Sequence, residues 1–470
     1  MTTPRQRGAT GAVLLAALAT AQLLVGLDYN IVFVALPEIA GLGFSPETLQ
    51  WVVSAYAIAF GGLLLLCGRL TDAMGRRRMF LIGLALFAAG SVLGTFAVAE
   101  WMLILGRGIQ GLGGAALAPS TLALLSVGFA EGAARNRALG IWGAAGSAGM
   151  VLGSILGGVL TDAFGWRSVF AINIPLVLLI VLLALRAVPA DEARPALRRI
   201  DIPGAVLTTA AAILVVMGFT GAAENGWDAP ATLITLIAGV IAAVVLLIVE
   251  ARTQDPLLDV HRFTNRHLAT GTGSTFLFMA GFGATAYFLT LYFQQTRGLS
   301  PLVTGLAFVI PCLGVLLGTS IGARLATRAG LRAAMVTGQI MGLVGVAAFA
   351  LLVGDTTSWA IVLVLAAFFS LGQGIVFTTM FAAATTGTAE AEQGTASGIA
   401  TAGQQIGGAI GLAVLINLTT ALGGDTLTTA MTGIAVIITI GLAIALLIPG
   451  RNRHAAGRPG KGVLAGAGRP

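Results

Sequence analysis

The sequence predicts an all-α polytopic membrane protein with fourteen transmembrane helices. Only 10% of its 470 residues are charged and 57% are hydrophobic, whereas about a quarter of the residues in a soluble domain are charged. Apolar runs long enough to cross a bilayer recur along the whole chain. Basic residues fall almost entirely in alternate connections between these runs, as the topology of a helical membrane protein requires.

A membrane-spanning helix needs about 20 predominantly apolar residues. Fourteen segments meet this requirement, namely 11–36, 47–67, 79–98, 101–125, 136–160, 168–188, 203–222, 230–250, 268–294, 301–322, 332–353, 358–382, 395–420 and 427–448. The first is too long for the apolar part of a signal peptide and lacks a clear cleavage site, so we interpret it as a span. An even number of spans places both termini on the same side.

Basic residues identify that side. It carries Arg5 and Arg7, Arg69 with Arg76 to Arg78, Arg135 and Arg137, and the basic residues of 186–199, 252–266, 324–332 and 451–470. The opposite side carries only Arg167 and Arg297. Positive charge marks the cytoplasmic face, so we expect a cell-membrane protein with both termini in the cytoplasm. The net charge of +7 then reflects topology, and we expect no nucleic-acid partner. The Arg-, Ala- and Gly-rich composition hints at a bacterial source with a high-GC genome.

Three motifs recur in the same order in the two halves of the chain. The matching pairs are 69–76 with 324–331, 105–109 with 371–375 (where Gln373 replaces Arg107), and Gly140, Gly149 and Gly153 with Gly398, Gly407 and Gly411. Two parallel six-helix halves around a central cavity are typical of a rocking secondary transporter. We therefore expect four parts: a six-helix bundle at 1–188, linkers with two inserted helices at 189–267, a second six-helix bundle at 268–450, and a disordered cytoplasmic tail at 451–470.

Asp28 is the most informative single residue. It lies in the first apolar run, within Leu27-Asp28-Tyr29-Asn30. A carboxylate at membrane depth is costly, and such residues commonly mark ion or proton pathways. Asp28 could instead be a helix-end residue solvated at the membrane interface. The first interpretation predicts a protein that moves a solute in exchange for protons.

Four motifs occur in order along the chain, at 27–37, 68–78, 107–114 and 146–158. Together they give the chain a resemblance to the fourteen-helix drug/proton antiporters of the major facilitator superfamily. The first runs from Leu27-Asp28 to Ala35-Leu36-Pro37, with Asn30 where Thr is common and Phe33 where Asn is common. The resemblance covers nearly the whole chain. It implies the major facilitator fold, with two pseudo-symmetric six-helix bundles, two inserted linker helices and export of antibiotics or other drugs.

The second motif is the cytoplasmic connection from Gly68 to Arg78. Gly75 permits a tight turn, and we expect Asp72 to pair with an Arg or with a helix N-terminus across the interface between the halves. The resemblance implies a conformational latch formed by Gly68, Asp72, Gly75 and Arg76. Simple anchoring by positive charge would explain Arg76 to Arg78 but not the spacing of Gly and Asp.

The third motif begins at Arg107 and ends at Gly114. In the family its buried Arg is assigned to proton transfer. Because Arg does not deprotonate in proteins, its effect must be electrostatic: the cation favours the ionised form of a nearby Asp28. We therefore predict that Asp28 and Arg107 form the proton-coupling site. A structural Arg that donates hydrogen bonds to helix carbonyls is the alternative.

The fourth motif, 146–158, resembles the glycine motif of antiporters, except that Ser147 replaces the usual Pro. Glycines at four-residue spacing create a smooth helix face for close packing, and ordinary packing alone would also explain them. The expected face consists of Gly146, Gly149, Gly153, Gly157 and Gly158.

We expect an apolar cavity with a few polar groups, with candidate lining residues Tyr29, Asn30, Tyr56, Gln110, Trp142, Met150, Tyr287, Gln294, Gln373, Phe377 and Gln404. Because the second half lacks an acidic residue deep in a span, we expect lipophilic substrates that are neutral or monocationic. We expect no cofactor, no metal site and no enzymatic activity. The expected partners are the substrate, protons and the lipid bilayer, and the protein is expected to act as a monomer.

A proton-coupled symporter, or a dedicated exporter of a metabolite, siderophore or lipid, is the alternative on the same fold. The glycine-rich fifth span argues against the symporter. A channel or receptor is a different class, and the twofold repeat favours a carrier over either.

Overall fold

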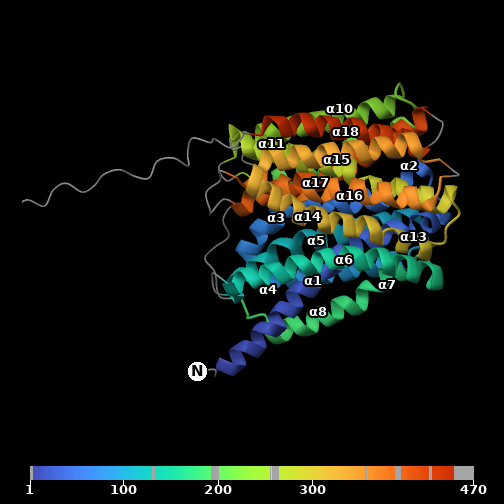
Figure 1. Ribbon diagram of the computed structural model, residues 1–470. Helices are drawn as coiled ribbons and strands as arrows, with labels where there is room; N and C mark the ends of the chain where they lie inside the picture. Colours follow the sequence, from blue (N-terminus) through green and yellow to red (C-terminus); the bar gives the residue numbers. More distant parts are fainter. Residues whose placement is uncertain are drawn as a thin grey trace, which may run out of the picture.

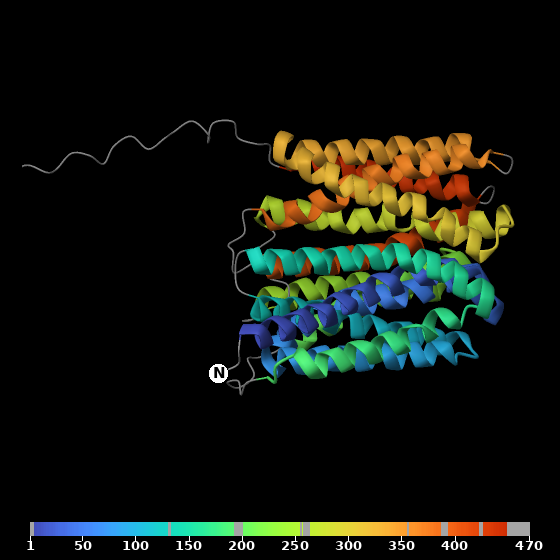
Figure 2. The same cartoon turned by 60° about the horizontal axis from the view of Figure 1, so that its bottom comes forward.

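The computed structural model describes residues 4–129, 133–191, 201–253, 256, 264–354, 357–386, 393–422 and 426–448. Its helices run side by side in one bundle (Figures 1 and 2), and the described residues include no β-strand. Fourteen helical stretches are long and apolar enough to cross a bilayer, which confirms the predicted number of spans. The tail predicted to be disordered, 451–470, lies outside the described residues.

The first half contains α1 (Pro4–Ile39), α2 (Pro46–Leu49), α3 (Trp51–Met74), α4 (Arg76–Thr95), α5 (Glu100–Gly128), α6 (Ala133–Phe164), α7 (Ser168–Ala171) and α8 (Asn173–Ala187). The inserted pair is α9 (Ile202–Asn225) and α10 (Pro230–Arg252). The second half contains α11 (Arg266–Phe278), α12 (Thr285–Leu291), α13 (Pro301–Ala307), α14 (Val309–Ala329), α15 (Leu331–Leu352), α16 (Trp359–Thr385), α17 (Gln393–Leu422) and α18 (Thr426–Leu447). A short 3-10 helix, η1 (Ala40–Leu42), follows α1, and two π-helical segments, η3 (Met279–Gly283) and η4 (Tyr292–Thr296), flank α12.

Two spans are interrupted near a proline. Pro175 cannot donate a hydrogen bond to the carbonyl four residues earlier, and the chain breaks between α7 and α8 at Ile172. Pro311 has the same effect on the carbonyl of Ala307, where α13 gives way to α14. The first break matters for function because Asn173, which begins α8, reaches the carboxylate of Asp28.

The repeated motifs occupy matching places in the two halves. Gly75 separates α3 from α4 with φ of 112°, and Gly330 separates α14 from α15 with φ of 92°. Residues other than glycine rarely adopt such angles. These glycines align in the sequence repeat, so both halves make the same helix-to-helix turn.

The glycine faces match as well. A Cβ atom on Gly149 of α6 would collide with the Leu23 carbonyl oxygen of α1, and one on Gly407 of α17 would collide with the Phe276 carbonyl oxygen of α11. The fifth span of each half therefore packs directly on the first span of that half.

The inserted helix α9 bridges the two halves on one side of the bundle. It packs between α3 and α17 in a small apolar cluster made of Ala57, Ile58, Ala212, Val216, Ala409 and Ala413. The Gln50 amide donates to the Thr220 hydroxyl at 3.0 Å, and the Asn417 amide donates to the Phe219 carbonyl at 3.4 Å. One inserted helix thus contacts both the first and the second half.

Candidate functional site: a buried ion pair beside a central cavity

Asp28 lies in the interior of α1 and not at its end. Its side chain is fully buried, and its carboxylate forms an ion pair with Arg107 of α5, with an N–O distance of 2.6 Å. This burial contradicts the interpretation of Asp28 as a helix-end residue solvated at the interface. An ionised carboxylate at such depth requires a partner, and the structure provides one.

Two neutral side chains complete the shell around the carboxylate. The Gln110 amide donates to one carboxylate oxygen at 3.0 Å and the Asn173 amide donates to the same oxygen at 2.8 Å. Gln110 also donates to the Ser91 hydroxyl at 2.9 Å. Asn173 and Ser91, both fully buried, were not predicted from the sequence. The only signal for Asn173 was a polar residue two positions before Pro175 in an apolar run.

Arg107 both pairs with Asp28 and donates a hydrogen bond to a helix carbonyl. Its Nε donates to the Val52 carbonyl of α3 at 2.8 Å, as a structural Arg would, while one terminal nitrogen bonds Asp28. The same nitrogen donates to Gln110 at 2.9 Å. The guanidinium carbon lies 4.4 Å from the centre of the Tyr56 ring, in a cation–π contact.

The predicted glycine face holds α1 against α6. Cβ atoms on Gly149 and Gly153 would collide with the Leu23 and Leu27 carbonyl oxygens of α1, and one on Gly157 would lie 2.8 Å from the Ile31 carbonyl oxygen. Gly146 approaches Gln22 and Gly26 of α1. Gly158 instead faces α13, where its Cβ would lie 2.6 Å from the Pro301 carbonyl oxygen. The face therefore positions the helix that carries Asp28.

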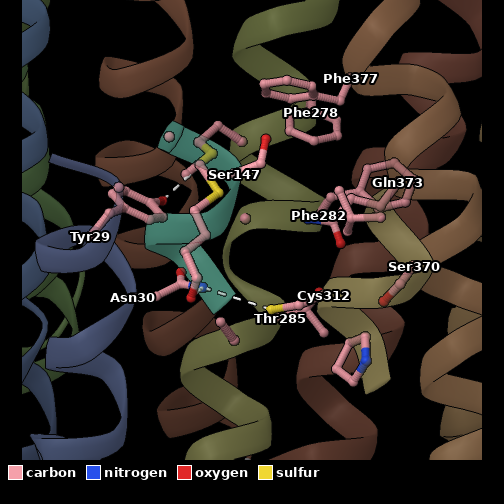
Figure 3. A pocket seen from close by; sticks show the side chains of 18 of the residues that line it. Tyr29, Asn30, Ser147, Phe278, Phe282, Thr285, Cys312, Ser370, Gln373 and Phe377 are labelled. Carbon is pink, nitrogen blue, oxygen red and sulfur yellow. Dashed lines mark hydrogen bonds between the residues drawn. The ribbon is translucent and has the colours of Figure 1, made fainter. Parts of the chain in front are cut away.

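A central cavity of about 350 Å³ lies between the halves. Of the eleven predicted lining residues, the structure places Tyr29, Asn30, Tyr56, Met150, Gln373, Phe377 and Gln404 on its wall. Figure 3 shows Tyr29 and Asn30 of α1 across from Phe282, Gln373 and Phe377 of the second half. The other described lining residues include Phe278, Phe308 and Phe369 but no Asp, Glu, Lys, Arg or His.

The other four predicted lining residues do not line this cavity. Their side chains have other surroundings. Gln110 faces away from the cavity and bonds Asp28. Tyr287 borders a smaller void near η3, and Gln294 donates to the Val34 carbonyl of α1 at 2.8 Å. Trp142 packs beside the core of the first half. The sequence predicts that these residues lie within membrane spans, but it does not predict which way their side chains point.

Asn30 links three helices at the cavity wall. Its amide donates to the Met150 carbonyl at 3.0 Å and to the Ser154 hydroxyl at 3.3 Å, both on α6. It also approaches the Cys312 sulfur of α14 at 4.0 Å. The Cys312 thiol is free and lines the cavity, whereas Cys67 is free and buried.

The predicted latch has a partner that the sequence did not reveal. The backbone N–H groups of Arg77 and Arg78, in the first turn of α4, donate to the two oxygens of the Asp191 carboxylate at 3.0 Å each. A Cβ atom on Gly75 would collide with this carboxylate. An anion at a helix N-terminus is favourable. Asp191 follows α8 of the same half, so this contact does not cross the interface between the halves.

Comparison with known proteins decides the family. The model of the Major Facilitator Superfamily matches residues 18–248 and 271–467. This chain belongs to that superfamily. It is 38% identical to the cephamycin export protein CmcT of Amycolatopsis lactamdurans, over 89% of this chain and 86% of the relative. It is also 38% identical to the puromycin resistance protein pur8 of Streptomyces alboniger, over 86% and 81%.

A solved structure shows the same fold. The crystal structure of a POT family transporter in complex with 5-aminolevulinic acid superimposes with a TM-score of 0.68 at 15% identity, covering 92% of this chain and 95% of that one. Together with the fourteen spans, these relatives establish a multi-pass membrane protein of a transporter superfamily. The predicted fold class and family are confirmed.

Proposed function

We propose that the protein exports lipophilic neutral or monocationic compounds in exchange for protons, by alternating access. One observation carries the proposal: the buried carboxylate of Asp28, paired with the buried Arg107, lies next to an apolar cavity whose described lining bears no Asp, Glu, Lys, Arg or His. A carboxylate can exchange a proton, whereas the cavity suits a solute held by apolar contact and hydrogen bonds.

The proposed cycle uses the proton as the competitor of the solute. With the cavity open to the cytoplasm, a compound enters and Asp28 releases its proton. The halves then rock, the compound leaves on the opposite side, and Asp28 takes up a proton there. Asp28 and Arg107 couple the two movements electrostatically. The proposal places both termini in the cytoplasm and requires neither a cofactor nor a second subunit.

A dedicated natural-product exporter is a second candidate, favoured by the names of the relatives. They include a cephamycin export protein and a probable actinorhodin transporter, the latter 33% identical over 84% of this chain. A multidrug resistance protein, Stp, is 34% identical over 83% of this chain. The names of the relatives therefore refer both to single natural products and to multidrug resistance.

The deciding experiment measures efflux of tetraphenylphosphonium, a lipophilic monocation, from vesicles with and without an imposed proton gradient. Wild type should export the probe only with the gradient, and Asp28→Asn should lose the gradient-driven component. Gradient-driven export that persists in Asp28→Asn would remove Asp28 from the coupling site. Failure of wild type to move this probe, combined with transport of natural antibiotics, would favour the dedicated exporter.

A further inference from the structure

Tyr56 of α3 belongs to both the cavity and the ion-pair site. It lines the cavity, and its ring lies 4.4 Å from the guanidinium carbon of Arg107. Neither Arg107 nor Asp28 belongs to the lining of the cavity, whereas Tyr56, which contacts Arg107, does. A compound in the cavity can therefore touch Tyr56 without reaching Asp28.

The same helix holds Arg107 at a second point. Val52, one turn before Tyr56, accepts a hydrogen bond from Arg107 Nε at 2.8 Å. The guanidinium thus contacts a carbonyl and a ring of α3 as well as the Asp28 carboxylate of α1, which lies at 2.6 Å. Any shift of the Tyr56 ring changes the space available to this cation.

Two glycines of α5 make room for Tyr56. A Cβ atom on Gly111 would collide with the Tyr56 carbonyl oxygen, and one on Gly114 would lie 3.0 Å from the Tyr56 hydroxyl oxygen. The hydroxyl has no hydrogen-bond partner among the described residues. Packing, and not a hydrogen bond, therefore sets the position of the ring, and a bound compound can displace it without breaking such a bond.

We propose that Tyr56 is the positioning residue that transmits occupancy of the cavity to the ion pair between Arg107 and Asp28. Protonation of Asp28 removes the charge that draws the guanidinium to it, so Arg107 relaxes toward Tyr56 and the ring moves into the cavity. A bound compound opposes this movement, returns the guanidinium to Asp28, and favours transfer of the carboxyl proton to water. Compound and proton then compete without touching. This inference rests on the proposed function.

The test counts protons released as tetraphenylphosphonium binds to purified full-length protein in weakly buffered detergent solution, at a series of starting pH values. Bound probe is measured separately. Wild type releases protons as it binds the probe, and Asp28→Asn releases none. Tyr56→Leu still binds the probe but loses most of the release, because Leu lacks the ring that touches the cation. Tyr56→Phe retains the ring and should behave as wild type.

Phe60→Leu is the matched control. Phe60 lies one turn further along α3, lines the same cavity and packs on Tyr56 with ring centres 5.9 Å apart. Its ring has no cation–π contact in the described part of the chain. The number of protons released per bound probe should be the same in Phe60→Leu as in wild type, whatever the affinity of the variant for the probe.

Equal release by Tyr56→Leu and wild type would overturn the role of Tyr56 and leave the proposed antiport intact. Wild type that releases no proton would overturn both.

Discussion

Four side chains from three helices, α4, α5 and α8, surround Asp28 of α1 and make an ionised carboxylate tolerable within the membrane. Arg107 supplies the countercharge, Gln110 and Asn173 donate hydrogen bonds, and Ser91 accepts one from Gln110. Removing one member of a buried pair leaves the other charge without compensation. The residues of this site therefore depend on one another.

A double-mutant cycle tests this dependence. Arg107→Gln alone should destabilise the protein by roughly 3–5 kcal/mol, because Asp28 would remain buried without its countercharge. Adding Asp28→Asn should recover much of that loss, since both charges are then absent. Thermal unfolding in detergent measures each variant. Additive losses would show that the two residues do not act as a pair.

The sequence predicted the charged members of this site but not the neutral ones. Asp28 and Arg107 stand out because charge is rare within spans, so composition alone singles them out. Asn173 and Ser91 are ordinary polar residues in sequence, and only the break at Ile172 and the packing of α4 on α5 bring them close to Asp28. The direction of a side chain could not be predicted either. Gln110 and Gln294 were expected to line the cavity, but they bond Asp28 and the Val34 carbonyl instead.

At the scale of elements, the packing of α6 on α1 positions Asp28. Gly153→Ala would place a methyl group against the Leu27 carbonyl, next to Asp28. We expect a loss of about 1–3 kcal/mol in stability and a larger fractional loss of proton-driven efflux, because α1 must shift. Thermal unfolding and vesicle efflux provide the two measurements.

Gly143→Ala is the control on the same helix, since nothing lies within 4 Å of a Cβ atom there. It should be neutral, or more stable by about 0.5–1 kcal/mol because Ala is the better helix former. Equal effects of Gly143→Ala and Gly153→Ala would contradict a specific role for the glycine face.

The cap of α4 is a second element-scale feature. Asp191→Ala removes the acceptor for two backbone N–H groups, and we expect a loss of about 0.5–2 kcal/mol in stability. Asp191→Asn keeps an acceptor oxygen and should lose less. Thermal unfolding and vesicle efflux should be measured for both variants. A cap that only stabilises α4 changes the unfolding temperature alone, whereas a cap that also limits the rate of transport changes the efflux rate as well. An unchanged unfolding temperature in Asp191→Ala would show that water replaces the carboxylate without cost.

At the scale of the whole molecule, the number and order of spans could be predicted because hydropathy and Arg placement are strong signals. The repeat was visible through Gly75 and Gly330, whose backbone angles admit few other residues. The bridging position of α9 between α3 and α17 was not visible, because its apolar contacts are made by Ala, Val and Ile, which carry no distinctive pattern.

Alternating access makes a prediction for Cys312, a free thiol on the cavity wall. A small maleimide should label Cys312 in wild type, and a transported compound should slow the labelling because it occupies the same space. Cys67 is 2% exposed and should stay unlabelled, so Cys312→Ser should abolish the signal, as mass spectrometry can show. Labelling that substrate leaves unchanged would place the substrate outside this cavity.

The correspondence of Arg107 with Gln373 has an evolutionary consequence. A chain built from two related halves carries two versions of each position, and here one version holds the charge while the other faces the cavity. Under the proposed function, selection on substrate range can act on the second half, through changes at Gln373 or Phe377, while leaving the proposed coupling residues untouched. New resistance phenotypes should therefore arise there first, as inherited changes in what is expelled and not in how expulsion is driven.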